Sequence, residues 1–173
     1  MRHSLTVILS FAFIPLVLCA CGESSYPAIP EKITDFKALN AAGDSVAYSS
    51  VRGSKATLVT FHASWCGYCI AEMPLLKLLS KDYADKGFRV IGIDEDDEFG
   101  TMAKFIAAEG LDAPGLHWTE LYWNYKVHSM FGSPKAIPAN FLIDSLGRIR
   151  SRAFGPIEET STRKAIELLL SGK

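Results

Sequence analysis

Two cysteines separated by two residues, Cys66 and Cys69, are the residues of this sequence best suited to chemistry. They lie in the stretch HASWCGYCIAEMP, directly after an apolar run and directly before a long helical pattern. Such a pair could be a redox dithiol, two ligands of a metal site, or a structural disulfide. A disulfide at this spacing closes too short a loop to stabilise a fold much through chain entropy, so the structural role is the weakest of the three.

The expected position of the pair at a helix start favours redox chemistry. The apolar run 56–62 (ATLVTFH) predicts a buried strand, and Cys66 falls at the first turn of the helix that follows. Free backbone N–H groups and the positive end of the helix dipole lower the pKa of a thiol there. Cys69 lies one turn deeper, with fewer free amides. We therefore expect Cys66 to be the attacking thiolate and Cys69 the resolving thiol that releases a mixed disulfide.

Glu72 is a candidate for moving a proton to or from the resolving thiol. On a helix it shares a face with Cys69, Leu76 and Leu79, and no Lys or Arg stands at those spacings. Desolvation on that apolar face would raise the pKa of the carboxyl and allow a proton shuttle to Cys69. The alternative is an ionised, solvated Glu72 at the rim of the face.

The first twenty residues have the layout of a signal peptide. A short basic start precedes an apolar run that is broken by Pro15 and is shorter than a membrane span requires. The run ends Leu18-Cys19-Ala20-Cys21, which resembles a bacterial lipobox with Cys21 as the lipidated residue, although Cys19 is unusual at its position. The alternative is an ordinary signal peptide cleaved after Ala20, which would leave Cys21 free.

Processing would leave few cysteines and one folded unit. Of four cysteines, one would leave with the signal peptide and one would carry lipid, so that only the CxxC pair remains, in an oxidising compartment. We expect a signal peptide over 1–20, a lipidated tether over 21–31 and a single domain over 32–173. With 18 basic and 19 acidic residues, the sequence has no basic footprint for nucleic acid.

Periodicity and turn residues predict an α/β domain with a mixed sheet. A helix over 68–86 between the strands 56–62 and 88–93 makes a βαβ half, and an antiparallel ββα half closes the chain. The other expected elements are a hairpin of 33–39 and 45–48, helices over 100–109 and 124–131, strands over 139–143 and 148–154, and a final helix over 157–170.

These motifs together resemble the thioredoxin superfamily. The resemblance rests on WCGYC followed by Pro74 in the helix, on Ala136-Ile137-Pro138 and on the following NFLIDSLGRI. The closer similarity is to the TlpA/ResA-like branch of membrane-anchored periplasmic thiol-disulfide oxidoreductases, and it runs from about residue 33 to 173. It includes an N-terminal hairpin before the core and an insertion over about 93–118, after the βαβ half.

The resemblance implies further site residues. Pro138 is expected to be cis and to abut the cysteine pair, and the Ile137 backbone to pair with an extended substrate segment next to Trp65. CxxCxxE is frequent in this branch, which fits Glu72. Thioredoxins proper usually have a buried Asp at the position of Thr60, so Glu72 is expected to be the only carboxylate close to the cysteines.

Other polar and aromatic residues are given structural roles. We expect His62 to border the site rather than to bind a metal, and His117 and His128 to be surface or core histidines. The acidic run 94–98 lacks the spacing of a calcium loop, which favours a solvated loop. An aromatic cluster, Trp118, Tyr122, Trp123 and Tyr125, could line a substrate groove but is more typical of packing.

The sequence thus predicts an extracytoplasmic thiol-disulfide oxidoreductase, more a reductase of protein disulfides than a general oxidase. It predicts no cofactor and no bound metal, a monomer held at a bacterial membrane by its lipid, and a membrane thiol-disulfide electron donor. A disulfide isomerase or oxidase is the alternative enzyme. A copper-binding metallochaperone module on a thioredoxin fold is the alternative from another class. The sequence names neither the substrate protein nor the direction of electron flow.

Overall fold

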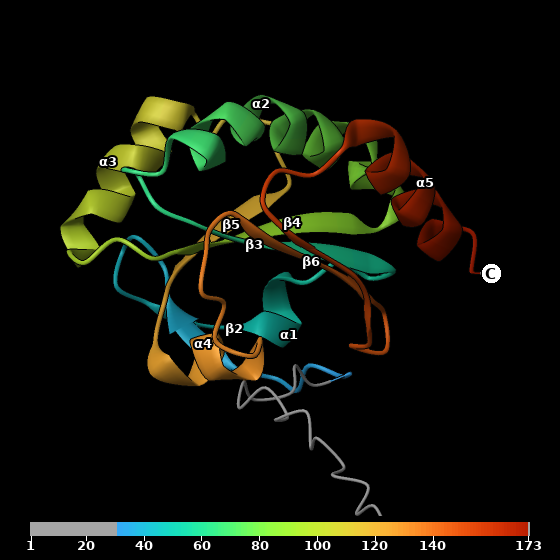
Figure 1. Cartoon of the computed structure of the whole chain (residues 1–173), viewed down its shortest axis with the longest axis horizontal. Coiled ribbons are helices and arrows are strands. Elements are labelled where there is room, and N and C mark those ends of the chain that lie inside the picture. The colour runs from blue at the N-terminus through green and yellow to red at the C-terminus, as the bar shows by residue number, and fades with distance from the viewer. Residues whose placement is uncertain (1–30, 173) are drawn as a thin grey trace, which may run out of the picture.

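The computed structural model describes residues 31–172. The expected signal peptide, most of the expected tether and Cys21 lie outside the described residues. The domain predicted for 32–173 forms one sheet with helices on both faces (Figure 1). None of the helices within the described residues is long and apolar enough to cross a membrane.

A mixed sheet with the strand order β2-β1-β5-β4-β3-β6-β7 forms the centre of the domain. The central strands β3, β4 and β5 are parallel, whereas β6 and β7 pair antiparallel on one side and β1 and β2 on the other. The strands are β1 (Lys37–Leu39), β2 (Ser45–Ala47), β3 (Ala56–His62), β4 (Phe88–Asp94), β5 (Trp118–Tyr122), β6 (Ala139–Asp144) and β7 (Ile149–Phe154).

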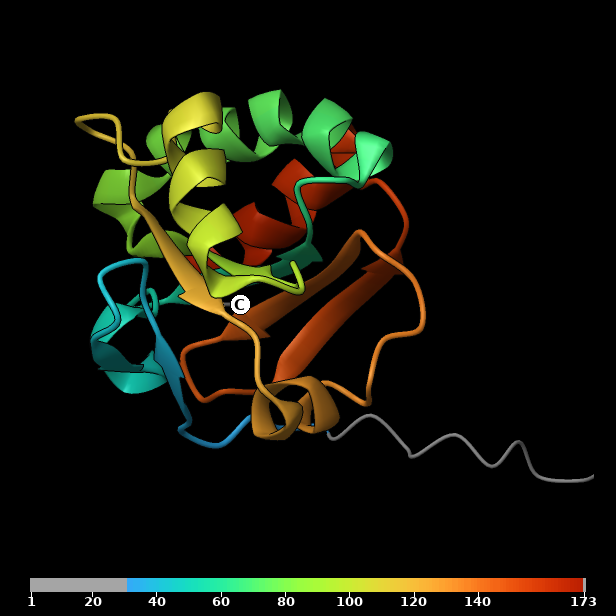
Figure 2. The same ribbon diagram turned by 90° about the vertical axis from the view of Figure 1, so that its left-hand side faces the viewer.

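The helices α2 (Gly67–Asp82), α3 (Phe99–Glu109) and α5 (Glu159–Leu170) cover one face of the sheet, and α1 (Tyr48–Val51) and α4 (Tyr125–Met130) lie on the other (Figures 1 and 2). A short 3-10 helix, Ala84–Lys86, follows α2 and ends at Gly87, whose φ of 90° is the left-handed conformation that glycine adopts most easily.

Successive side chains of the buried strands point to opposite faces of the sheet, so the core forms two clusters, one on each face. Val59 and Phe61 of β3 pack into the cluster below the sheet, with Phe36, Phe131 and Phe141. Leu58 of the same strand points the other way, into the cluster under α2, α3 and α5, which includes Met73, Leu76, Leu79, Phe105 and Ile166. Each central strand is therefore buried on both faces, as its continuous apolar sequence predicts.

The expected elements are present, with the short helix α1 and the strand β5 in addition. Strand β3 has the predicted bounds, α2 ends earlier and is extended by the 3-10 turn, and Tyr48 begins α1 rather than ending the hairpin. The added strand is β5, which the sequence interpretation took for part of an aromatic cluster. It pairs with β4 and, at Leu39, with the hairpin, so that it joins the hairpin to the rest of the sheet.

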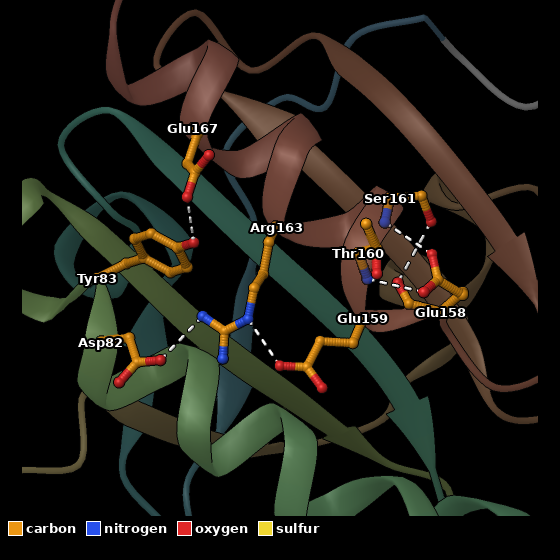
Figure 3. A network of polar contacts seen from close by, with 8 residues as sticks. All are labelled: Asp82, Tyr83, Glu158, Glu159, Thr160, Ser161, Arg163 and Glu167. Carbon is orange, nitrogen blue, oxygen red and sulfur yellow. Dashed lines mark hydrogen bonds and ion pairs between the residues drawn. The ribbon is translucent and has the colours of Figure 1, made fainter.

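A polar network fastens the C-terminal helix to the end of α2 (Figure 3). Arg163 of α5 binds Asp82 at 2.9 Å and Glu159 at 2.8 Å. The hydroxyl group of Tyr83 donates to Glu167, and Glu158 caps α5 by accepting the N–H groups at its start. The loop between β7 and α5 contacts the buried side of α2, where the Ile157 N–H group donates to Glu72.

Candidate functional site

Cys66 and Cys69 form a disulfide at the start of α2, with their Cα atoms 5.2 Å apart. Cys66 is the N-cap residue, and its sulfur accepts the N–H of Cys69 at 3.2 Å. Cys66 is 7% exposed, whereas Cys69 is fully buried behind it. The sulfur nearer to solvent is therefore also the one that receives a helix N–H group.

The loop before β6 closes over the pair from the other side. Its Ile137–Pro138 peptide bond is cis, as the resemblance implies. The Ile137 carbonyl oxygen lies 3.8 Å from the Cys66 sulfur, which carries no proton in the disulfide, so the two atoms are in contact without a hydrogen bond. Beside them, a surface cavity of about 340 Å³ is lined by Trp65, Glu95, Pro134, Lys135, Ala136 and Ile137.

Two large aromatic side chains flank Cys66 in the sequence. Trp65 is 69% exposed and Tyr68 is 73% exposed, although both adjoin buried cysteines. Exposed aromatic groups next to a cavity are suited to contact a partner chain. The four residues of the expected aromatic cluster differ in exposure. Among them, Trp118, Tyr122 and Trp123 are half-buried, and only Tyr125 is largely exposed.

Glu72 lies on the buried face of α2, as the helix geometry predicts. It is 5% exposed, and Cys69, Leu76 and Leu79 on the same face are fully buried. The Ile157 N–H group donates to Glu72 Oε1 at 2.6 Å, and the side-chain amide of Asn140 donates to both carboxylate oxygens at 3.2 and 3.3 Å. Glu72 is therefore a buried, hydrogen-bonded carboxyl group and not a solvated rim residue.

The pKa of Glu72 reflects a competition between burial and these donors. Burial raises the pKa, and it outweighs the Ile157 N–H group, the Asn140 amide and the positive charge of His62, all of which favour the carboxylate. The result is a raised pKa, so the group titrates closer to neutral pH than an ordinary glutamate. A carboxylate whose pKa is raised is a stronger proton acceptor than an ordinary glutamate.

His62 is part of a buried polar cluster that the sequence interpretation did not anticipate. It is fully buried at the end of β3, and its Nε2 atom lies 2.6 Å from Glu120 Oε1. The other oxygen of Glu120 accepts the indole N–H of Trp118 at 2.6 Å. Glu120 is 7% exposed, so the domain buries a second glutamate besides Glu72.

The acidic run after β4 is also more buried than the predicted solvated loop. Asp94 is fully buried and Asp96 is 3% exposed, because parallel pairing with β3 carries the end of the strand into the sheet. Asp96 accepts the N–H and hydroxyl groups of Ser64, and Asp94 accepts the Asp96 N–H group. The run thereby anchors the loop that leads to Cys66, and only Asp97 and Glu98 are exposed.

His128 and His117 are half-buried, in keeping with structural roles. His128 Nε2 lies 3.1 Å from Glu95 Oε1, but burial and the Lys135 charge lower the pKa of this histidine and so disfavour an ion pair. Within residues 31–172, no group of three or more His, Cys, Asp or Glu side chains is placed to hold a metal ion.

The fold and the site define the class. A central mixed sheet, a CxxC disulfide at the start of the helix after β3, and a cis-proline loop facing it make this a thioredoxin-like protein. The chain belongs to the AhpC/TSA family, whose sequence profile matches residues 29–152.

Named relatives agree with this class. The thiol:disulfide interchange protein HelX of Rhodobacter capsulatus is 29% identical over 134 residues, which are 72% of this chain and 66% of HelX. The thiol-disulfide oxidoreductase ResA of Bacillus anthracis is 25% identical over 73% of this chain and 70% of ResA. A Chlorobium tepidum structure described as a thiol:disulfide interchange protein DsbE has a TM-score of 0.69 and 27% identity, covering 81% of this chain and 96% of that one.

The comparisons confirm the expected family resemblance and the thioredoxin-like fold, and they confirm a thioredoxin-like thiol-disulfide oxidoreductase as the class of enzyme. The structure brings together the cysteine pair, Trp65, Ile137, Pro138 and Glu72, all named from the sequence. Sequence reasoning missed Glu120 and the burial of Asp94. The His62 partner of Glu120 and the strand that pairs with Asp94 are distant in the sequence, so the only local signal was an acidic residue inside the mostly apolar segment WTELY.

Proposed function

We propose that this protein is an extracytoplasmic reductase of protein disulfides, held at a bacterial membrane by a lipid on Cys21. The observation that carries the enzymatic part is the asymmetry of the pair. Cys66 is at the N-cap of α2 beside a surface cavity, and Cys69 is fully buried behind it. This arrangement suits one thiol to attack an incoming disulfide and the other to resolve the product.

The reaction begins from the reduced pair. The Cys66 thiolate attacks one sulfur of a substrate disulfide, forming a mixed disulfide and expelling the first substrate thiolate. Cys69 then loses its proton and attacks the Cys66 sulfur, so that the Cys66–Cys69 bond forms as the bond to the substrate breaks. Two electrons pass from the pair to the substrate, which leaves with two thiols, and the enzyme is left as the disulfide seen in the structure.

Glu72 takes the proton of Cys69 in the second step. Its burial on the face of α2 that carries Cys69 and its raised pKa support this role. Asn140 and Ile157, which bind its carboxylate, also line a surface cavity of about 220 Å³ beside the start of α5. That cavity is the route by which the proton reaches solvent.

Trp65, Ile137 and Pro138 bind the substrate. An extended segment next to the substrate cysteine lies along the cis-proline loop and hydrogen-bonds to the Ile137 backbone, and Trp65 packs on it. The contact of the Ile137 carbonyl with the Cys66 sulfur supports this placement, because a substrate bound there holds its disulfide within reach of Cys66.

A thiol-disulfide donor in the membrane returns the enzyme to its dithiol form, and the lipid keeps the enzyme close to that donor. The enzyme acts as a monomer, without a cofactor. The names of the relatives HelX, ResA and DsbE support thiol-disulfide exchange as the reaction. The reduction potential of the Cys66–Cys69 pair decides whether the enzyme reduces or oxidises its substrates.

Single substitutions at the two cysteines test the proposal. We expect Cys66→Ser to abolish reduction of a peptide disulfide, and Cys69→Ser to accumulate a mixed disulfide that mass spectrometry locates at Cys66. Equilibration of the wild-type pair with glutathione then gives its potential. A value as oxidising as that of a dedicated oxidase, about −120 mV, would replace the reductase by the oxidase alternative. Faster alkylation of Cys69 than of Cys66 would reverse their roles.

Glu72→Gln tests the proton acceptor separately. The variant retains the shape of the side chain and loses only the titratable group. The first attack should remain as in the wild type, whereas release should slow by roughly 100-fold, the lower figure for loss of a general base. An unchanged release rate would reduce Glu72 to a structural residue without affecting the roles of the cysteines.

A further inference from the structure

The face of the sheet that α2 and α3 cover is mostly apolar, but one row of paired residues across it is not. Asn140 of β6, Thr60 of β3, Gly92 of β4 and Glu120 of β5 are paired in register across four adjacent strands. Paired residues lie on the same face of a sheet. Apolar residues from the same strands fill the rest of that face under the helices. A polar row thus runs from the hydrogen-bonding partner of Glu72 to Glu120.

His62 lies next to this row and reaches across it. It is two residues beyond Thr60, on the same face, and it binds Glu120 on the second strand away, with only Gly92 between them. A Cβ atom at position 92 would overlap the carboxylate of Glu120, so the glycine leaves the space in which the pair meets. Phe105 of α3 stacks on the imidazole with 5.1 Å between ring centroids and covers it from solvent.

The surroundings of His62 favour its charged form. Burial by itself would lower the pKa of the imidazole, but the carboxylate of Glu120, with the charges of Asp94 and Asp96, outweighs burial and raises it. Within the described chain, neither His62 Nδ1 nor Asp94 Oδ2 has a protein partner, and the two residues are paired in register.

Five carboxyl groups interact electrostatically with His62: Glu120 of β5, Asp94 of β4, Glu95 and Asp96 of the loop after it, and Glu72 of α2. Phe105 of α3, which stacks on the imidazole, carries no charge. Among these groups, Glu72 is the one on the helix of the cysteine pair, and the charge of His62 is one of the factors that lower its pKa against the effect of burial.

We propose that His62 is a positioning residue of the reaction: held by Glu120, it is the buried positive charge that keeps Glu72 able to accept the proton of Cys69. The inference rests on the proposed function and adds to it the residue that influences the protonation state of Glu72. When Cys69 attacks the mixed disulfide, its proton moves to a Glu72 carboxylate, and the nearby imidazolium stabilises that carboxylate beforehand. His62 itself neither gains nor loses a proton in the step.

Two substitutions remove the same charge in different ways. His62→Gln removes the imidazole, and Glu120→Gln leaves the histidine in place without the carboxylate that holds its proton. His117→Gln, the same substitution at a half-buried histidine outside the cluster, is the matched control. Stopped-flow mixing of the reduced protein with a peptide disulfide separates the first attack, which depends on peptide concentration, from release, which does not. Each rate is measured as a function of pH.

We expect both variants to move the pH midpoint of release upward by about one unit, and to slow release near pH 7 by about tenfold, because one unit is a tenfold change in the ionised fraction. The first attack should change much less, and the double variant should resemble either single variant. His117→Gln should match the wild type. If His62 and Glu120 had only a structural role, the substitutions would lower the amplitude of the release phase or the stability of the protein. The pH midpoint of release would then stay as in the wild type.

The inference is overturned if folded His62→Gln and Glu120→Gln proteins both keep the wild-type release profile. Glu120→Gln preserves the shape of the side chain and its bonds to His62 and Trp118, so it decides the question even if His62→Gln does not fold. If Glu72→Gln leaves release unchanged, this inference fails with the role of Glu72. The Cys69→Ser trapping experiment then still decides whether the cysteine chemistry is correct.

Discussion

Replacing Glu95 by glutamine should make the protein more stable at alkaline pH. Burial, reinforced by the charge of Asp94 and opposed by that of His62, raises the pKa of Glu95 from 4.5 to about 7. The fold therefore holds this proton more tightly than the unfolded chain does. Below about pH 4.5 the Glu95 carboxyl group does not destabilise the fold. As the pH rises to about 7, it lowers the free energy of unfolding progressively.

The size of the effect follows from these two values. Each pH unit between them corresponds to about 1.4 kcal/mol, which gives an upper bound of roughly 3 kcal/mol. The Glu95 side chain is 17% exposed, so solvent reduces the penalty, and about 2 kcal/mol is the appropriate expectation. Glu95→Gln should raise the free energy of unfolding by about 2 kcal/mol near pH 8, and by less than about 1 kcal/mol near pH 5.

Urea unfolding of the oxidised protein at a series of pH values measures this difference. Glu98→Gln is the matched control, because Glu98 is an exposed glutamate of the same loop whose side chain makes no cap hydrogen bond. That control should unfold like the wild type at every pH. If Glu95→Gln shows the same pH dependence as the wild type, the carboxyl group is not protonated by burial, and the electrostatics derived for the acidic loop are wrong.

Three other substitutions test separate parts of the structure. Gly92→Ala should lower the free energy of unfolding by about 2 kcal/mol in urea, because its Cβ overlaps the Glu120 carboxylate, whereas Gly100→Ala, in open space, should not destabilise the protein. Trp65→Ala should slow the first attack on a peptide disulfide several-fold in stopped flow and leave release unchanged; slowing of release alone would contradict its role in substrate binding. Cys21→Ser should release a soluble protein or leave the precursor uncleaved on cell fractionation, and an unmodified wild-type N-terminus would refute lipidation.

Most of the cysteine site follows from local patterns. The apolar run of β3, the helix start at Cys66 and the face of α2 that carries Glu72 depend on residues within a few turns of one another. For that reason the periodicity of the sequence predicts the burial of Glu72 without knowledge of the rest of the fold. The cis state of Pro138 came instead from the family resemblance, since nothing in the local sequence requires it.

The other half of the site depends on strand register, which the sequence does not display. Glu120 interrupts the apolar pattern of β5, and its burial is understandable only because His62, 58 residues earlier, lies within 2.6 Å of it. Likewise, an acidic run such as 94–98 is typical of a solvated loop, and only pairing with β3 and β5 makes Asp94 part of the sheet. When two charged residues are buried as a pair, the sequence shows each without its partner, and each is then predicted to be a surface residue.

The position of Thr60 connects these two halves. Thioredoxins usually place a buried Asp there, whereas here Thr60 is fully buried between Asn140 on one side and Gly92 on the other. A carboxylate at this point would stand in the same polar row as Glu120 and beside the residue that binds Glu72. Like charges so close in a buried site disfavour one another's ionisation. The threonine therefore adds no carboxylate beside Glu72 and leaves the positive charge of His62 to be shared by fewer carboxylates.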